Sequence, residues 1–503
     1  MQERCSYMSH KRQHGQRRSW EAIGSRLIPF LFLALIARAI CNIYFHPLSK
    51  YPGPKYAAIT DLVYQMVSIW GIVPTWTADQ HKKYGEVVRL GPGRLSYTHP
   101  QAWKEIYGHR VGTRKPGVKD KKFAAYQEEY NGEDTIISTL DDGEHSAIRK
   151  IFSHAFSDRA LKEQESLIRK YTDVLIDNVS QAPGEIDMVK LYNCTTFDIM
   201  GDLSFGESLG LLTRSEYSPW VKAVFGNIKA GSLLTLGYQY PFLLSIIKPL
   251  VPRSLREQAR LHFEHSAERV DRRMEKGSDK PDIWNLVLEK EQGKLTLPQM
   301  HANASIFMIA GTETTATLLS GLTYLLLTNP AKMAKAVEEV RGLECKDDLN
   351  LETLPRLKYL SACFEEALRC YPPAVVGSPR QVAKGGSEIC GNWVPENTQV
   401  NVPQYATFHS ALNFKDPDSF IPERWLPGTG YDSDRKEGLQ PFSTGPRNCI
   451  GKNLAYHEMR MIMAQMLWNF DLELCPQSAE WTDQKCWTLW EKPPLWVKAK
   501  FIR

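Results

Sequence analysis

The sequence predicts a mainly α-helical protein with small β-sheets, an α+β fold built around one large body. Three observations lead to this prediction. Between about residues 141 and 370, apolar residues recur at helical spacing, as in Ser157–Val179 and Pro330–Leu343. Short strand-like runs such as Gln399–Val402 lie among residues rich in proline, glycine, asparagine and aspartate. No internal repeat or low-complexity linker divides the chain, which excludes an array of small modules.

The composition narrows the class of protein. Of 503 residues, 43% are hydrophobic and 24% are charged, which excludes a disordered or collagen-like chain. The net charge of +5 is spread along the sequence, so no basic stripe predicts nucleic-acid binding. The ten cysteines form no CxxC pair, which removes support for a zinc ribbon or a c-type haem attachment site. Their irregular spacing indicates reduced thiols in a cytosolic environment.

The N-terminus predicts a membrane anchor after a basic leader. Residues 1–26 form the leader, and residues 27–45 are nineteen mostly apolar residues, close to the length that spans a bilayer. Two alternatives remain open. A secretory signal would have a small-x-small cleavage site, which Ala37-Arg38-Ala39 matches. A buried core helix would also be apolar.

Residues 46–55 predict a stiff hinge between this segment and a catalytic body at residues 56–503. Three prolines, Pro47, Pro52 and Pro54, fix the backbone φ angle and stop helices. The six Lys and Arg residues before residue 27 favour a cytosolic N-terminus with the rest of the chain across the membrane.

The first half of the body begins with a predicted β-hairpin. Glu86–Leu90 and Arg94–Thr98 flank a Gly-Pro-Gly turn, and a helix is expected at Pro100–Tyr107. Residues 109–139 are rich in glycine and charge and predict a long loop, which in a compact body is usually functional. A long apolar helix is expected at about Pro298–Thr328.

The C-terminal part carries the most informative segment of the sequence. Residues 442–451, FSTGPRNCIG, have the form F-x-x-G-x-R-x-C-x-G, and a helix is expected from about Asn453 to Asn469. Gly445 and Gly451 permit a tight turn around Cys449. The following helix directs its positive end toward that sulfur, which is expected to lower the pKa of the thiol.

This loop resembles the haem-ligating loop of the cytochrome P-450 superfamily. The resemblance implies that Cys449 is the axial ligand of haem iron, since a thiolate donates electron density that favours O–O cleavage. It implies that Phe442 shields the sulfur from water, that Gly445 and Gly451 aim backbone N–H groups at it, and that Arg447 pairs with a haem propionate.

Further motifs occur in the order that this superfamily requires. Ala310, Gly311, Glu313 and Thr314 match its A/G-G-x-D/E-T pattern, which implies that Thr314 and Glu313 handle protons during dioxygen activation, while Gly311 leaves space. The alternative is that Thr314 only bonds to the carbonyl one turn earlier in the helix.

Two more sets of residues follow from the resemblance. His145 and Arg149, four apart on one helix face, and Arg380 match positions that contact haem propionates, although a solvated basic helix face would look the same. Glu366 and Arg369, with Arg424 of a P-E-R motif, match a buried network behind the haem. A surface salt bridge is the alternative for the first pair.

The resemblance covers nearly the whole chain, and phrases such as HPLSKYPGPK and FIPERWL are similar to filamentous-fungal members. Such members include the isotrichodermin hydroxylase branch of secondary metabolism. The implied fold is a triangular-prism helical body with haem b between the oxygen-activating helix and the cysteine-loop helix. The implied activity is oxidation of a lipophilic terpenoid or polyketide intermediate, with O2 and with electrons from NADPH through a reductase.

The family also implies a location and partners. We expect a monomer in the endoplasmic reticulum membrane, held by a single N-terminal anchor with its body in the cytosol, because a reduced thiolate and access to the reductase need the cytosol. This is opposite to the charge bias of the leader, which a later translation start would explain. Lys452, Arg435 and Lys436 are expected to face the reductase, with an ordinary solvated patch as the alternative.

Substrate contacts are expected from several large apolar segments. These are residues 109–139 and 205–250, Phe307 and Ala310, Pro373–Pro379, and Trp487 and Trp490 near a final hairpin. Two rival functions remain open at this point. One is a haem-thiolate isomerase or dehydratase that uses no external oxygen, and the other is a haem-binding protein without catalysis.

Overall fold

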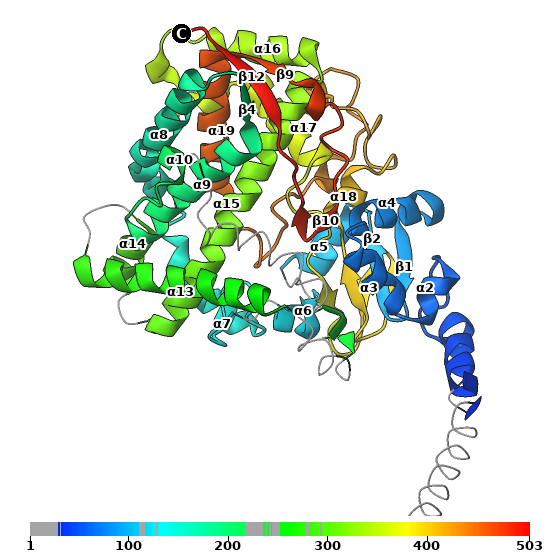
Figure 1. The fold of residues 1–503 in the computed structure, drawn as a ribbon. Helices are drawn as coiled ribbons and strands as arrows, with labels where there is room; N and C mark the ends of the chain where they lie inside the picture. The colour runs from blue at the N-terminus through cyan, green and yellow to red at the C-terminus, as the bar shows by residue number, and fades with distance from the viewer. Residues whose placement is uncertain are drawn as a thin grey trace, which may run out of the picture.

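The structure confirms the predicted α+β class. It is a computed structural model that describes residues 29–30, 32–109, 116–126, 129–214, 216, 235–237, 239–240, 243, 252–277, 282–291 and 294–503. A large helical body lies beside a smaller part that carries the main sheet, and the N-terminal helix projects from that smaller part (Figure 1).

The main sheet has five strands in the order β1-β2-β8-β5-β3. The predicted hairpin is confirmed as β1 (Val87–Gly91) and β2 (Arg94–Tyr97). Strand β8 (Gln399–Asn401) runs parallel to β2, and β5 (Arg380–Gln381) is antiparallel to β8. The last strand, β3 (Val118–Lys119), sets Lys119 opposite Arg380, so two basic residues far apart in the sequence become neighbours.

The prediction of an irregular loop over residues 109–139 is wrong in part. It contains β3 and helix α6 (Lys121–Tyr126), whose start is capped because the Asp120 carboxylate accepts a hydrogen bond from Phe123 N at 2.9 Å. A two-residue strand and a six-residue helix are too short to show a sequence period. Residues 110–115 and 127–128 lie outside the described residues.

Helix α15 (Leu297–Leu327) runs through the helical body, as the long apolar run predicts. It starts with a capping box between Thr296 and Gln299. Helix α9 (Met188–Phe205) packs along it and is buried over almost its whole length, which explains why its apolar residues show no one-sided pattern. The two helices form the centre of the largest apolar core.

The remaining helices surround this pair or support the sheet. They are α2 (Lys55–Ile59), α3 (Leu62–Ile69), α4 (Val73–Tyr84), α5 (Gln101–Tyr107), α7 (Asp142–Ser153), α8 (Asp158–Gln181), α10 (Leu211–Arg214), α13 (Arg253–Lys276), α14 (Ile283–Glu291), α16 (Pro330–Arg341), α17 (Lys358–Cys370), α18 (Gln404–Phe408) and α19 (Lys452–Asn469). The predicted helices Ser157–Val179, Pro330–Leu343 and Asn453–Asn469 are therefore confirmed as α8, α16 and α19.

The C-terminal chain returns to the body through short strands. Strands β4 (Glu185–Asp187), β12 (Trp496–Phe501) and β9 (Phe470–Leu474) form one sheet in that order. The expected final hairpin is β10 (Cys486–Trp487) with β11 (Leu489–Trp490). A further hairpin joins β6 (Ser387–Ile389) and β7 (Asn392–Val394).

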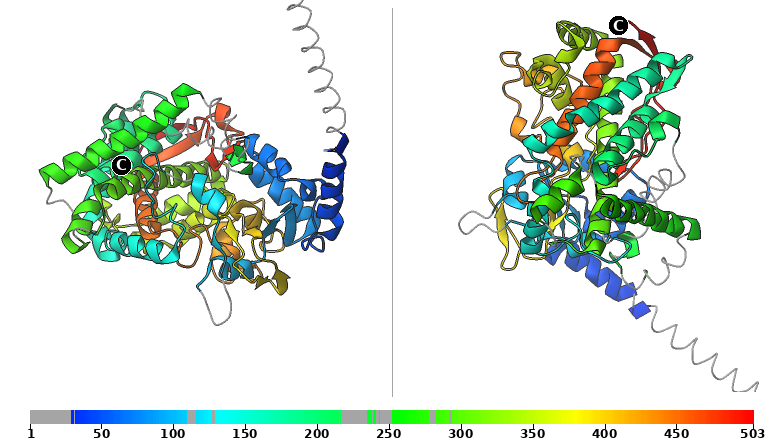
Figure 2. Two further views of the ribbon diagram at one scale, coloured as in Figure 1. Left: turned by 90° about the horizontal axis from the view of Figure 1, so that it is seen from below. Right: turned by 90° about the vertical axis from the view of Figure 1, so that its left-hand side faces the viewer.

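The N-terminal helix lies at the outer edge of the smaller part (Figure 2), where its C-terminal end contacts the body through hydrogen bonds of Asn42 with Ile59 and Arg89. Residues 29–30 and 32–40 are helical and continue into η1 (Cys41–Phe45). Its apolar side chains are exposed, with Phe30 at 69% and Phe45 at 78%, so the buried core helix is excluded. Within the described residues, no helix has both the length and the apolarity to cross a membrane. The leader 1–26 and residues 27, 28 and 31 of the expected anchor lie outside the described residues.

Glu366, Arg369 and Arg424 are brought together in the body and are fully buried. Glu366 accepts hydrogen bonds from Arg369 Nη2 at 2.8 Å and from Arg424 Nε at 3.0 Å. Trp425 Nε1 donates to the same carboxylate at 2.9 Å. Asp434, which the sequence analysis missed, pairs with Arg424 and balances the charge. Although burial raises the pKa of Glu366, the two guanidinium groups hold it below its usual value.

Candidate active site

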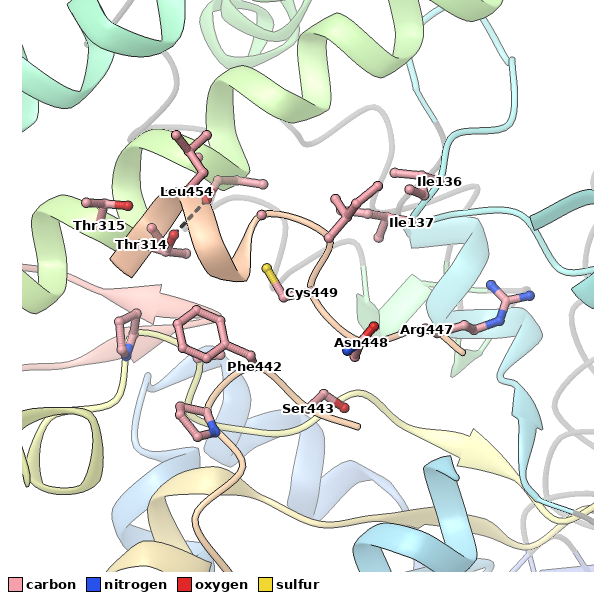
Figure 3. A pocket seen from close by; sticks show the side chains of 18 of the residues that line it. Ile136, Ile137, Thr314, Thr315, Phe442, Ser443, Arg447, Asn448, Cys449 and Leu454 are labelled. Atoms are coloured by element: carbon pink, nitrogen blue, oxygen red, sulfur yellow. Dashed lines mark hydrogen bonds between the residues drawn. The ribbon is translucent and has the colours of Figure 1, made fainter. Parts of the chain in front are cut away.

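A cavity of about 370 Å³ lies between α15, the cysteine loop and α19. Among the described residues that line it, apolar side chains make most of the wall, Cys449 is the one thiol, and basic side chains gather at one edge. Figure 3 shows the Cys449 sulfur pointing from its loop into the space beside α15, with Ile136 and Ile137 on the far wall. The predicted site residues on this wall are Ala310, Gly311, Thr314, His145, Arg149, Arg380, Phe442, Arg447, Cys449 and Gly451.

The cysteine loop is a tight turn held by backbone contacts. Cys449 N donates to Phe442 O at 2.9 Å, and Asn448 N donates to Gly445 O at 3.1 Å. Gly445 has a φ of +79°, and a Cβ there would lie 1.9 Å from Tyr107 O, so only glycine fits. This contact presses the loop against the end of α5 and fixes where the sulfur lies.

The Cys449 thiol is exposed only in the sense that it forms the wall of an internal cavity. Burial raises its pKa, while the Gly451 N–H, Arg149 and Lys452 lower it. The lowering that we expected from the helix start is therefore outweighed by desolvation. A metal ion reverses this balance, because a coordinating thiol is deprotonated outright.

Five basic side chains converge at the edge of the cavity, and Lys119 joins the four that the sequence predicts. Burial, and then Arg447 and Arg149, lower the pKa of His145 to about 4. Burial, and then Arg380 and Arg447, lower the pKa of Lys119 to about 7. Groups that repel each other in this way favour an anionic ligand. The sequence did not predict Lys119 as a site residue, because β3 has only two residues and is too short to show a strand pattern.

Two of the residues expected to bind the haem propionates, Arg149 and Arg447, already form hydrogen bonds within the protein. Arg149 donates to Asn448 O at 2.6 Å and to its Oδ1 at 2.7 Å, which ties α7 to the cysteine loop. Arg447 donates to Thr139 O at 2.8 Å and to Asp142 Oδ1 at 2.8 Å. Arg380 is buried and makes a weaker set, with Ser378 Oγ at 3.1 Å and Pro379 O at 3.4 Å.

The A-G-T-E-T motif divides between the cavity and the protein interior. Ala310, Gly311 and Thr314 line the cavity, and Thr314 Oγ1 donates to Ala310 O at 2.7 Å, which is the alternative weighed above. A Cβ at Gly311 would lie 2.7 Å from Met200 Sδ, so this glycine lets α9 approach closely. The expectation that Gly311 leaves open space is therefore only partly met.

Glu313 is buried away from the cavity wall and pairs with Lys492, a residue that the sequence analysis missed. Lys492 Nζ also donates to Thr317 Oγ1 at 2.5 Å. Burial raises the pKa of Glu313 and lowers that of Lys492, and the contact between them opposes both shifts. The structure thus separates the acid of the motif from the threonine beside it.

The expected substrate contacts are brought together only in part. Phe307, Pro373 and Ile136 line the cavity. Trp487 and Trp490 instead pack and bond elsewhere, with Trp487 Nε1 donating to Ile69 O and Trp490 Nε1 to Pro372 O, both at 2.9 Å. Most of residues 215–251 lie outside the described residues.

The residues expected to face a reductase differ in their contacts. Arg435 Nη1 pairs with Glu86 Oε1 at 2.6 Å, so its charge is partly compensated. Lys452 is exposed and lies over the Phe442 ring, 5.9 Å from its centroid. Lys436 is half-buried in a short 3-10 turn.

The lining fits a haem. Apolar walls suit the macrocycle, one thiol suits its iron, and the basic edge suits two carboxylates. Residues 52–498 match the family model for cytochrome P-450. The chain is 52% identical to cytochrome P-450 monooxygenase FUM2 of Gibberella moniliformis, over 91% of this chain and 98% of the relative. It is 46% identical to cytochrome P-450 monooxygenase efuB of Hormonema carpetanum, over 96% and 97%. It is 44% identical to cytochrome P-450 monooxygenase AMT3 of Alternaria alternata, over 95% and 98%.

Proposed function

The chain belongs to the cytochrome P-450 family and is a cytochrome P-450 monooxygenase that uses haem iron, and from this premise we propose that it oxidises a lipophilic intermediate of fungal secondary metabolism. The observation that carries the proposal is the cavity itself, with one thiol, apolar walls and a basic edge. The apolar lining supports a lipophilic substrate of terpenoid or polyketide type. Electrons would come from NADPH through a reductase that docks near Lys452.

We propose that the Cys449 sulfur would bind the iron of haem b. The Gly451 N–H bonds to its sulfur and tempers its charge, and α19 begins directly behind it. Arg380, Lys119 and neutral His145 would bind the propionates, while Arg149 and Arg447 hold the loop in place.

Haem bound in this way would supply reductive activation of dioxygen, so that one oxygen atom enters the substrate and the other leaves as water. The chain itself shapes that reaction. Phe307 and Leu318 contribute apolar wall that disfavours water in the cavity, and the Thr314 hydroxyl holds a proton at that wall.

Replacement of the sulfur tests the assignment. Cys449→Ser should take up haem but lose the thiolate absorption signature of the ferrous carbon monoxide complex, because oxygen donates less electron density than sulfur. Cys345→Ser is the matched control, since Cys345 is exposed and not part of the cavity wall. A Cys449→Ser protein that keeps the thiolate signature would show that another group ligates the iron. Product formation without O2 or NADPH would instead favour the isomerase or dehydratase.

We propose further that the protein acts as a monomer at the endoplasmic reticulum membrane, with residues 27–45 at the lipid and the body in the cytosol. The support is the exposed apolar surface of Phe30, Phe32, Leu33, Leu35 and Phe45. Removal of residues 1–45 should release the protein from membranes in cell fractionation, and a truncated protein that still sediments with them would contradict the anchor.

A further inference from the structure

Glu458 is a buried carboxyl group on the cavity wall to which nothing above assigns a role. It lies on α19, it is 1% exposed, and it lines the cavity with Thr315 and Leu454. Its Oε1 atom has no hydrogen-bond partner among the described residues. A buried polar oxygen without a hydrogen-bond partner is destabilising, so its presence beside a cavity indicates a functional role.

The two acids near this wall are held in opposite ways. Glu313 is paired with Lys492 and does not line the cavity. Glu458 lines the cavity together with Thr315 of α15, whose hydroxyl interacts with the carboxyl and lowers its pKa. The carboxyl that meets the cavity is therefore not the one in the A-G-T-E-T motif.

The charged groups on the surrounding elements have other partners. On α17, Glu365 accepts from Tyr456 Oη at 2.7 Å. On α19, Arg460 lies over the Tyr456 ring, and His457 faces Asp158 and Glu165 of α8. On α15, Glu313 is bound to Lys492. Across these described residues no cation neutralises Glu458, and burial raises its pKa to about 8 while the Thr315 bond lowers it.

We propose that Glu458 and Thr315 form a proton-delivery site on the cavity wall. Glu458 passes its proton to Thr315 Oγ1, and Thr315 releases its own hydroxyl proton into the cavity. Glu458 is left as a carboxylate and takes its next proton from water. No electrons move in this step, since the reductase supplies them. The proposal rests on the proposed function, but its first test does not require turnover.

The site suits proton delivery for two reasons. A general acid works best when its pKa lies near the working pH, and a hydroxyl can accept one proton while it donates another. Glu313 is unsuited to this role because it is paired with Lys492. Protonation of its carboxylate would break this buried ion pair and leave the lysine charge without a partner.

The first experiment is infrared difference spectroscopy of the full-length holoenzyme across the pH range around 8. All proteins carry Glu129→Gln, because burial also raises the pKa of Glu129 to about 7. We expect a protonated-carboxyl band that disappears as pH rises in this background and in its Glu313→Gln variant, and that is absent in its Glu458→Gln variant. Glutamine keeps the size and polarity of the side chain without the titrating proton. A Glu129→Gln protein with no such band, or a band that survives when Glu458→Gln is added to it, would overturn the proposal whether or not the enzyme turns over.

The second experiment separates proton delivery from a structural role. Glu458→Gln should lower product formation per NADPH by about 100-fold, at the lower end of what a general acid contributes, and should increase the solvent isotope effect. Thr315→Val should behave alike, whereas Thr315→Ser, which keeps the hydroxyl, should restore the wild-type values. Equal activity in the valine and serine variants, with haem content unchanged, would refute the relay. If Glu458→Gln fails to fold, the Thr315 pair and the band of the Glu129→Gln protein decide the question.

Discussion

Lys492 and Glu313 form a contact in which each charge depends on the other. Their side chains are 2% and 3% exposed, so water cannot solvate either one alone. We predict that Lys492→Met destabilises the protein by about 3–5 kcal/mol, because it leaves an unpaired carboxylate in the interior. Urea unfolding of the variant and the wild type measures this loss.

Two further variants identify the cause of that loss. Lys492→Arg keeps the positive charge and should lose much less stability. Lys492→Met combined with Glu313→Gln removes both charges and should recover most of the loss, since neutral partners need no compensation. A double variant as unstable as Lys492→Met would mean that the packing of the lysine stem, rather than charge, is responsible.

At the residue scale, the sequence reveals groups whose pattern is local. Cys449 and Gly445 stand in one ten-residue motif, and the structure places both at the cavity and its loop as that motif implies. Lys492 meets Glu313 across 179 residues, and nothing around it in the sequence marks its partner. Glu458 lies on the helix that follows the motif, but only the cavity distinguishes it from an ordinary helix glutamate.

At Gly321, helix α15 closely approaches Tyr371, the residue that follows α17. A Cβ at this position would lie 2.3 Å from Tyr371 Cδ1. Tyr371 cannot move away easily, because its ring stacks on Trp490 at 5.2 Å and lies 5.3 Å from Trp481. We predict that Gly321→Ala lowers the free energy of unfolding by about 1–3 kcal/mol through overpacking. Thermal unfolding measures this loss of stability, and haem content is a second readout.

Gly93→Ala is the matched control at this scale. A Cβ at Gly93 meets nothing within 4 Å, so the same change of one methyl group should leave stability unaltered. If Gly321→Ala is as stable as Gly93→Ala, the contact between α15 and Tyr371 accommodates the added methyl group and the overpacking argument is wrong.

Element prediction depended on length. The helices α8, α15, α16 and α19 have at least 12 residues each and could be predicted from the spacing of their apolar side chains. Strand β3 and helix α6 could not, because tertiary contacts hold them: β3 pairs with β5, and Asp120 caps α6. The same short strand carries Lys119 to the cavity, so a missed element became a missed site residue.

For the whole molecule, buried neutral histidines predict a loss of stability in acid. Burial lowers the pKa of His81, His262 and His409 from 6.5 to about 4 in each case. The unfolded chain therefore binds more protons than the folded one between these values, and stability must fall as pH decreases from 6.5 to about 4. Each histidine contributes on the order of 3 kcal/mol over that window. Urea midpoints across it measure the fall.

His81→Gln tests one share of that fall. Nδ1 of His81 bonds to Gly85 O and Nε2 to Ser96 Oγ, both at 2.8 Å, an arrangement that suits the neutral ring. Glutamine does not titrate, so the variant should have a flatter dependence of stability on pH. The exposed His109→Gln should keep the wild-type slope. Equal slopes in both variants would contradict the assignment.

Sequence motifs were sufficient for the fold class and the family, because the cysteine loop and the A-G-T-E-T helix occur in a fixed order around one cofactor. They did not predict which basic residues of the cavity are available for a propionate and which hold the cysteine loop in place. Arg149 and Arg447 share the charge that suits a propionate, yet their hydrogen bonds go to Asn448 and Thr139. Such choices depend on the angle at which α7 meets the loop, and no local pattern encodes that angle.

The Lys492 contact also limits how this gene can be recombined with its relatives. A crossover anywhere between codons 313 and 492 takes the acid from one parent and its partner from the other. Unless both parents carry the same pair, the chimera inherits an unpaired charge in its interior. Residues 492–503 should therefore come from the same parent as α15 when hybrid enzymes are assembled.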